Sequence, residues 1–205
     1  ESVVEHLRQY QTIFISAHIM PDGDCLGSAL GLTWTLRKMG KTVNVTCPDH
    51  VSNSFAYLPG FSELGQKTPT DEQFLVYVDG SSADRFGAAY DTRFFDGRPV
   101  MVIDHHVTNE FFAPMNYVDT HAASTAEIIH RIVGALGVAI DKPIAQCLLT
   151  GVITDTLGFR TASTTVETLR TATALMEAGA SIPDIVERSF NQVPMPNLRL
   201  RGRVF

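Results

Sequence analysis

The sequence predicts an α/β protein with a doubly wound, mainly parallel sheet of five strands, helices on both faces and a helical C-terminal part. Two observations predict this fold. Apolar runs of strand length recur in the first half of the 205-residue chain, and segments with helical periodicity separate them. The runs are continuously apolar, which indicates a parallel sheet buried on both faces. We expect the strand order 2-1-3-4-5, with a ligand crevice where the order reverses.

The predicted elements of the first half alternate between helix and strand. A short amphipathic helix at 3–10 precedes a β-branched strand at 12–17, and a helix from 24 to 39 ends at Gly40. Residues 48–72 are polar and irregular. The remaining four strands are expected at 42–46, 74–78, 100–103 and 115–118.

The second half is expected to be helical after the last strand. Residues 124–127 have the pattern of a capping box at a helix start, and 141–143 begin the next helix with an aspartate and a proline near its first turn. A second capping box at 164–167 opens a helix that ends near Gly179, and Pro183 starts a short final helix. We find no internal repeat.

Composition and charge narrow the classes of function. The formal net charge of -6 argues against a freestanding nucleic-acid groove, because phosphate contacts need clustered Lys and Arg. The three cysteines are odd in number and form no C-x-x-C pair, so neither a disulfide framework nor a thiolate zinc site is predicted. These features predict a reducing, cytoplasmic setting. No apolar stretch reaches the roughly 18 residues of a membrane span, so we expect no membrane partner.

Three of the predicted strands end on acidic or histidine residues. His18 ends the first, Asp79 follows the third, and the triplet Asp104-His105-His106 follows the fourth. Because parallel strands share one carboxyl edge, these side chains are expected to converge, with Asp79 between the other two. Convergence of this kind predicts a functional site at that edge.

The turn after the first strand is the centre of this site. Asp22 and Asp24 lie on a tight loop one residue apart, where they can face different cations. Ser28 lies in the helix that follows, and the start of that helix favours a phosphate. The alternative is an Asx turn in which Asp24 is an N-cap and His18 a hydrogen-bonded core residue.

Six side chains at this edge could bind a hard or borderline cation. Four are carboxylates and two are imidazoles: His18, Asp22, Asp24, Asp79, His105 and Asp155. Four carboxylates packed together would repel one another, and two divalent cations cancel their charge. The oxygen-rich, thiol-free set favours Mn²⁺ or Mg²⁺, with Asp79 placed to bridge two ions that activate a water for attack on phosphorus.

These motifs together resemble the DHH phosphoesterase superfamily. The residues that carry the resemblance are His18-x-x-Pro21-Asp22-x-Asp24, Val78-Asp79, Asp104-His105-His106 and the segment 150–160, in that order. Within the superfamily the chain is similar to the NrnA-like group of short-oligonucleotide and phosphoadenosine-phosphate hydrolases, which is related to RecJ. The resemblance spans residues 12 to about 165.

The resemblance implies a role for each motif residue. One ion is held by His18, Asp22 and Asp79, and the other, with Mn²⁺ the expected metal, by the set Asp24, Asp79, His105 and Asp155. His106 faces the substrate phosphate and Asp104 orients the histidines. The alternative for His106 is a buried, hydrogen-bonded histidine.

Two arginines are candidates for contact with the substrate phosphate. Arg160 could form a phosphate fork or an interhelical salt bridge, and Arg85 has the same two options. Ser124 and Thr125 are expected to be caps rather than ligands.

The resemblance also implies a domain organisation. Residues 1–190 would be the catalytic domain and 191–205 the start of an interdomain linker. The family's second, substrate-binding domain has a Gly-rich, His-containing motif. No Gly-Gly pair occurs in this chain, so we expect that domain to be absent from it.

The predicted function is a metal-dependent phosphoesterase that hydrolyses short oligonucleotides or small nucleotides. One alternative is a manganese-dependent inorganic pyrophosphatase or polyphosphatase, which shares the four motifs. Another is a non-catalytic module that senses a nucleotide. The sequence leaves the physiological substrate and the oligomeric state open, with a homodimer among the options.

Overall fold

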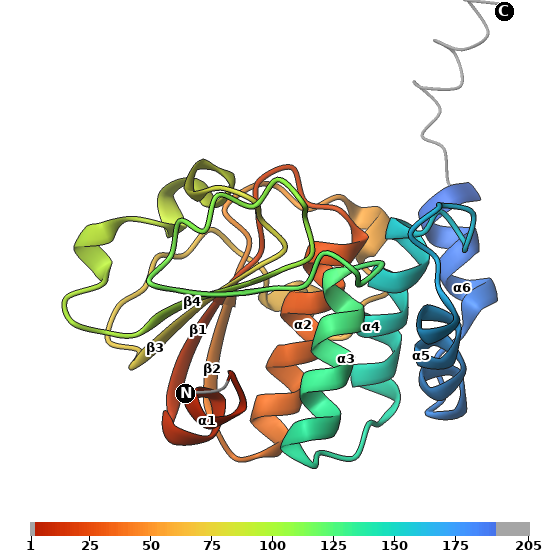
Figure 1. Ribbon diagram of the computed structural model, residues 1–205, viewed down its shortest axis with the longest axis horizontal. Coiled ribbons are helices and arrows are strands. Elements are labelled where there is room, and N and C mark those ends of the chain that lie inside the picture. Colours follow the sequence, from red (N-terminus) through yellow and green to blue (C-terminus); the bar gives the residue numbers. More distant parts are fainter. Residues whose placement is uncertain (1–2, 192–205) are drawn as a thin grey trace, which may run out of the picture.

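A five-stranded sheet forms the centre of the protein (Figure 1), whose computed structural model describes residues 3–191. Its strands are β1 (Thr12–Ser16), β2 (Thr42–Thr46), β3 (Phe74–Val78), β4 (Val100–Asp104) and β5 (Met115–Val118). All neighbouring strands are parallel, in the order β2-β1-β3-β4-β5. The predicted fold class and strand order are therefore confirmed.

Burial explains why the apolar runs became strands. Every residue of β3 and β4 is buried, as expected for central strands covered on both faces. The edge strand β2 exposes Thr42 and Asn44, which alternate with buried valines.

The longer α-helices stack on one face of the sheet. They are α1 (Val3–Gln9), α2 (Gly23–Lys38), α3 (Thr125–Leu136), α4 (Lys142–Asp155), α5 (Val166–Glu177) and α6 (Ile182–Val186), followed by a π-helical turn at Glu187–Asn191. Helices α2, α3 and α4 lie side by side, with α5 and α6 beyond α4 (Figure 1). Within residues 3–191 we find no helix both long and apolar enough to traverse a bilayer.

Small residues let α2 and α4 approach closely. An added Cβ at Gly27 would lie 2.3 Å from the carbonyl oxygen of Cys147, and one at Gly151 would lie 2.6 Å from Oδ1 of Asp24. This contact brings the beginning of α2 against the end of α4. The loop aspartates after β1 are thereby placed beside Asp155, the last residue of α4.

An aromatic cluster fills the other face of the sheet. Phe14, Tyr77 and Phe86 are fully buried there, and Tyr77 donates a hydrogen bond to the carbonyl of Ala89 at 2.8 Å. Short 3₁₀ helices cover this face at Ala83–Ala89 and Thr92–Phe94. Two further 3₁₀ turns, Asn53–Phe55 and Phe61–Glu63, lie in the stretch predicted to be irregular.

The predicted caps at 124–127 and 164–167 differ in detail from the observed ones. Ser124 accepts a hydrogen bond from the Glu127 amide at 3.1 Å, but the Glu127 carboxylate accepts from the hydroxyl of Thr168 at 2.8 Å instead of closing the box. The second box is formed one residue later, by Thr165 and Thr168. Residues 192–205, which include most of the predicted linker, lie outside the described residues.

Candidate metal centre

The carboxyl edge of the sheet gathers all six predicted metal ligands. Their ligand atoms form overlapping groups in which every pair lies within 4.8 Å. One group contains His18, Asp22 and Asp79, and another contains the set Asp24, His105 and Asp155. The loops after β1, β3 and β4, the first turn of α2 and the end of α4 supply these residues, as the parallel topology predicts.

His18 leads the first group. Its Nε2 lies 3.7 Å from Oδ2 of Asp22 and 3.5 Å from Oδ2 of Asp79. Its Nδ1 lies 2.7 Å from the carbonyl oxygen of Ile19 and can donate to it, which leaves the Nε2 lone pair facing the carboxylates. His18 and Asp79 are buried, whereas the Asp22 side chain is 57% exposed, so this position opens towards solvent.

His105 leads the second group. Its Nε2 lies 3.9 Å from Oδ2 of Asp24, 3.7 Å from Oδ1 of Asp79 and 3.6 Å from Oδ2 of Asp155. This ring nitrogen is buried and has no hydrogen-bond partner. A buried polar atom of this kind is costly unless something binds it, and three surrounding carboxylates make a cation the fitting partner.

Asp79 is a member of the His18 group and also lies next to His105 of the second group. Its Oδ2 faces His18 and its Oδ1 faces His105, while the hydroxyl of Thr125 donates to Oδ1 at 2.8 Å. The backbone of Asp79 has a φ of 64°, in the left-handed region that residues other than glycine rarely adopt. Such strained conformations cluster at functional sites, and this one turns the carboxylate between the two groups.

Asp24 is held by the start of α3. Its Oδ2 accepts from the Thr125 amide at 2.7 Å and its Oδ1 from the Ala126 amide at 2.9 Å. The N-cap of α2 is Asp22, so the alternative in which Asp24 caps that helix is wrong. Ser28 is fully buried and its hydroxyl lies 3.4 Å from Oδ1 of Asp24, which places it behind this carboxylate rather than at an open phosphate site.

His106 is oriented by Asp104. Its Nδ1 donates to Oδ1 of Asp104 at 2.7 Å, and the other oxygen of that buried carboxylate accepts from Asn109 at 2.7 Å. The hydrogen bond to Asp104 raises the pKa of His106 above its ordinary value, which favours the imidazolium. The His106 side chain is 42% exposed, so it can reach a ligand. Asp104 orients this histidine alone, because Nδ1 of His105 lies 3.4 Å from the carbonyl of Ala122.

Crowding shifts the pKa values of the carboxylates apart. Burial and the charges of Asp79 and Asp22 raise the pKa of Asp155 to about 6, against the opposing effect of a neighbouring histidine. Burial and the charges of Asp79, Asp155 and Asp22 raise the pKa of Asp24 well above its usual range. Asp22 is the exception: desolvation opposes ionisation, but His18 and two backbone amides lower its pKa to about 2. Divalent cations would relieve this repulsion.

We predict that Mn²⁺ affinity rises as the pH is raised through about 6, because Asp155 must release its proton to bind metal. In the metal-free protein, the stability of the fold changes with pH in the opposite direction. The pKa of Asp155 is raised from 3.8 to about 6 on folding, so the folded chain binds more protons than the unfolded chain between these values, and its stability falls as the pH rises through them.

Calorimetric titration of Mn²⁺ across this pH range, and urea unfolding of metal-free protein, measure the two effects. Asp155→Asn should flatten both pH dependences. An Mn²⁺ affinity that stays constant from about pH 5 to pH 7 would contradict the assignment of Asp155.

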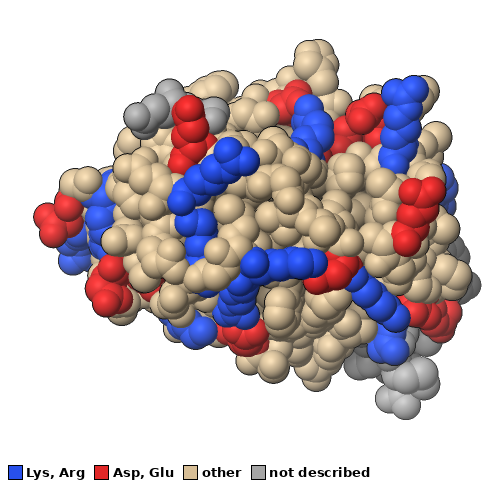
Figure 2. Space-filling view, turned by 90° about the horizontal axis from the view of Figure 1, so that it is seen from below, with Lys and Arg blue, Asp and Glu red and all other residues tan. Residues whose placement is uncertain are grey.

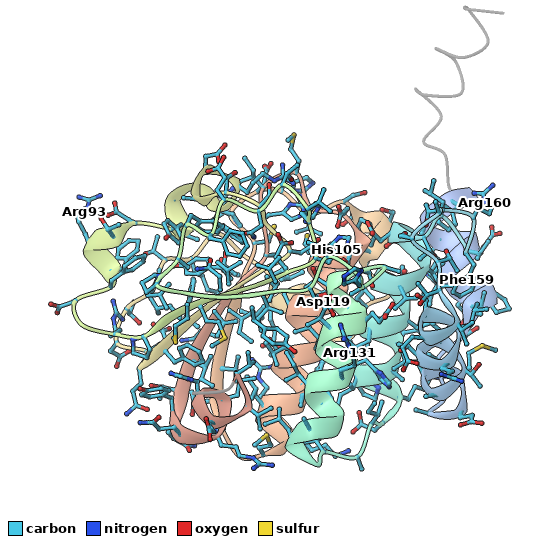
Figure 3. The ribbon with its side chains drawn as sticks, in the orientation of Figure 1. Arg93, His105, Asp119, Arg131, Phe159 and Arg160 are labelled. Carbon is cyan, nitrogen blue, oxygen red and sulfur yellow. The ribbon has the colours of Figure 1, made fainter. Side chains whose placement is uncertain are left out.

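Arg160 lies away from the metal-binding groups. Its Nε donates to the carbonyl of Leu157 at 2.6 Å, and in Figure 3 it lies at the right-hand margin, well separated from His105. Among residues 3–191 no acidic side chain lies within ion-pair distance of it, so the interhelical salt bridge is not formed, and the phosphate contact stays a prediction.

Four residues make contacts at this site that the sequence did not predict, although Thr125 and Arg85 were named there for other roles. Thr125 was expected to be a cap, yet it also fixes Asp79 through its hydroxyl. Cys25 joins the His18 group, and burial raises the pKa of its thiol to about 12. Asn109 supports Asp104, and Arg85 lies against His18. No residue spacing in the sequence predicts these contacts. The only indications were that Cys25 follows Asp24 directly and that Asn109 lies close to the triplet 104–106 in the sequence.

The family model described as "DHH family, N-terminal domain" matches residues 12–152. The chain belongs to the DHH family. The resemblance predicted from the four motifs is therefore confirmed, and the matched segment of this DHH chain includes five of the six predicted ligands.

Curated relatives match nearly all of this DHH chain. The bifunctional oligoribonuclease and PAP phosphatase NrnA of Thermus thermophilus is 34% identical over 193 residues, which are 94% of this chain and 57% of that protein. The protein of the same name from Bacillus subtilis is 25% identical, over 99% of this chain and 64% of its own length. The chain thus spans about three fifths of these relatives.

Solved structures share the fold. An exopolyphosphatase-related protein from Bacteroides fragilis superimposes with a TM-score of 0.88 at 26% identity, covering 98% of this chain and 64% of that one. Exonuclease RecJ bound to manganese has a TM-score of 0.56 at 16% identity, covering 92% of this chain and 53% of that one, which supports the fold alone.

Proposed function

We propose that this DHH domain is the catalytic part of a phosphoesterase that uses two divalent cations, with Mn²⁺ the expected metal. The observation that carries the proposal is the shared carboxylate of Asp79, whose two oxygens face two separate groups of ligands. His18 and Asp22 complete one binding position. The set Asp24, His105 and Asp155 completes the other.

Each part of the site has a chemical role in hydrolysis. A pair of divalent cations, when bound, lowers the pKa of water and neutralises charge on a phosphate. His106 holds a proton at Nε2 while Asp104 accepts from its Nδ1, so it can donate to a phosphate oxygen or to the leaving oxygen. Thr125 and the start of α3 hold Asp79 and Asp24 in place, which keeps the ligands preorganised.

The substrate class proposed is the phosphate ester of a short oligonucleotide or small nucleotide. Support comes from the NrnA relatives, which are named as oligoribonucleases and PAP phosphatases. The chain has 16 Lys and Arg against 22 Asp and Glu, and on the face seen in Figure 2 the two signs of charge are interspersed. A small phosphorylated substrate bound largely by metal and a few donors suits such a surface better than a long nucleic acid does.

The test compares three substrates with Mn²⁺ present: a dinucleotide, phosphoadenosine phosphate and inorganic pyrophosphate. We expect the first two to be hydrolysed faster than pyrophosphate. A strong preference for pyrophosphate would favour the alternative function, for which a 21% identical relative named as a probable manganese-dependent inorganic pyrophosphatase provides weaker support. Failure to hydrolyse any of them, with Mn²⁺ bound, would favour the nucleotide-sensing module.

Three further predictions stay proposals. The three cysteines are free and buried, which is consistent with a reducing, cytoplasmic setting. A homodimer remains one option for the assembly. Residues 1–190 are proposed as one catalytic domain and 191–205 as the beginning of a linker to a substrate-binding domain.

A further inference from the structure

Arg85 is anchored at the metal edge by its backbone. It lies in the 3₁₀ helix that follows β3, and its carbonyl accepts a hydrogen bond from the amide of Ile19 at 2.7 Å. Its own amide donates to the carbonyl of Ser82 at 3.2 Å. The first bond joins the loops after β1 and β3, which also carry His18 and Asp79, and the second holds the turn that contains Arg85.

The guanidinium of Arg85 lies against the ring of His18. One Nη2 is 3.0 Å from Nδ1 of His18, and that nitrogen also lies 2.7 Å from the carbonyl of Ile19. For Nε2 of His18 to bind a cation, the ring proton must be on Nδ1, where it is donated to Ile19. The same Nη2 lies 3.5 Å from Nε2 of His18. With the proton on Nδ1 and a cation on Nε2, neither ring nitrogen can accept a hydrogen bond, so the Arg85 donors that face the ring are left without an acceptor there.

Arg85, like Arg160, has no acidic partner among residues 3–191, whereas several other arginines do. Arg37, Arg93 and Arg131 each form an ion pair with a carboxylate, at 2.7, 2.5 and 2.6 Å respectively. Within the part of the chain that the structure describes, no carboxylate lies within ion-pair distance of Arg85. A half-buried guanidinium with free donors is a suitable site for an anion.

Charge at the edge favours a phosphate once the metal positions are filled. Four carboxylates and two divalent cations cancel formally, which leaves the positive charge of Arg85 at this edge. Arg85 contacts His18, whose Nε2 lies 3.5 Å from Oδ2 of Asp79. A phosphate bound at the metal positions on this side would therefore lie close to the guanidinium.

We propose that Arg85 contacts the substrate, donating hydrogen bonds to the non-bridging oxygens of a phosphate group on the His18 side of the metal centre. This inference rests on the proposed function and assigns to Arg85 the phosphate contact that the sequence also offered to Arg160. The planar fork of arginine matches two phosphate oxygens, which a lysine would contact as a point charge.

The experiment measures binding rather than turnover. The 205-residue chain is loaded with Mn²⁺, whose stoichiometry and affinity are measured by calorimetry, and inorganic phosphate binding is then measured by ³¹P relaxation. Arg85→Ala should bind Mn²⁺ as the wild type does but weaken phosphate affinity by roughly tenfold to a hundredfold, the loss typical of a hydrogen bond to a charged group. The phosphate affinity of Arg85→Lys should lie between those of the wild type and Arg85→Ala.

Arg93→Ala is the matched control. Arg93 is an arginine on the next 3₁₀ helix, its side chain is 85% exposed, and it lies at the opposite margin of the molecule from Arg160 (Figure 3). Its removal changes the net charge equally and should leave phosphate affinity unchanged. A general electrostatic effect would weaken binding in both variants and would overturn the proposal.

Two other results of these binding measurements would also contradict the proposal. Weaker Mn²⁺ binding in Arg85→Ala with normal phosphate affinity would mean that the guanidinium only supports His18, and the proposal would be wrong. A wild-type chain that binds Mn²⁺ but no phosphate would overturn it too. If Arg85→Ala does not fold, Arg85→Gln is judged by the same criteria.

The failure of this inference can be told apart from failure of the proposed function. Phosphate bound through Arg85 by a protein that hydrolyses no nucleotide would refute the function alone. Nucleotide hydrolysis by a protein whose phosphate affinity is indifferent to Arg85 would refute this inference alone.

Discussion

Asp79→Asn is expected to abolish hydrolysis and to weaken Mn²⁺ binding at both positions. An asparagine offers one oxygen where Asp79 offers two, and its NH₂ would face either His18 or His105. It also removes one of the four negative charges that the cations balance. The loss should exceed the roughly 10- to 100-fold effect of a residue that only supports a metal ligand.

Initial rates on a dinucleotide and calorimetric Mn²⁺ titrations measure these losses. Asp119→Asn serves as the control, because Asp119 pairs with Arg131 at 2.6 Å and belongs to neither ligand group (Figure 3). Asp22→Asn and Asp155→Asn, which each alter one group, should weaken one position more than the other. An Asp79→Asn protein with wild-type activity and two bound ions would refute the shared-carboxylate site.

Gly27→Ala is expected to destabilise the fold more than an ordinary overpacked core substitution. The new Cβ would lie 2.3 Å from the carbonyl oxygen of Cys147 and 3.0 Å from the amide nitrogen of Gly151, and both are backbone atoms that no side-chain rotation can move. Helices α2 and α4 would have to separate. We expect a loss at or above the upper end of the usual range, about 3 kcal/mol.

Urea unfolding of metal-free protein measures this loss. Gly134→Ala is the matched control, since a Cβ there meets no atom within 4 Å inside helix α3, and alanine should stabilise the helix by up to about 1 kcal/mol. The stability of Gly31→Ala should lie between those of Gly27→Ala and Gly134→Ala, because the new Cβ meets the flexible side chain of Leu148 at 2.5 Å. If Gly27→Ala were as stable as Gly134→Ala, the close packing of α2 on α4 would be wrong.

The strands and the site edge were predictable because local patterns determine them. Three strands have the bounds expected from their apolar runs, namely 42–46, 74–78 and 115–118. Once the sheet is parallel, its topology alone brings His18, Asp79 and the 104–106 triplet together. No knowledge of side-chain packing is needed for that step.

Features that depend on contacts between distant segments were not predictable. Thr125 reaches Asp79 across 46 positions and Arg85 reaches His18 across 67, with no motif to announce either contact. The shift of the second capping box has a similar cause. Either of two adjacent threonines, Thr164 or Thr165, could cap the helix. Thr168 completes the box with Thr165 and also donates a hydrogen bond to Glu127 on α3. The sequence pattern does not reveal this second contact.

The central claim is that two cations share the carboxylate of Asp79. Electron paramagnetic resonance of the chain titrated with Mn²⁺ tests this most directly, because ions joined through one carboxylate are magnetically coupled. We predict uptake of two Mn²⁺ per chain with a coupled spectrum that Asp79→Asn abolishes. Uptake of a single ion, or two ions with uncoupled spectra, would contradict the account.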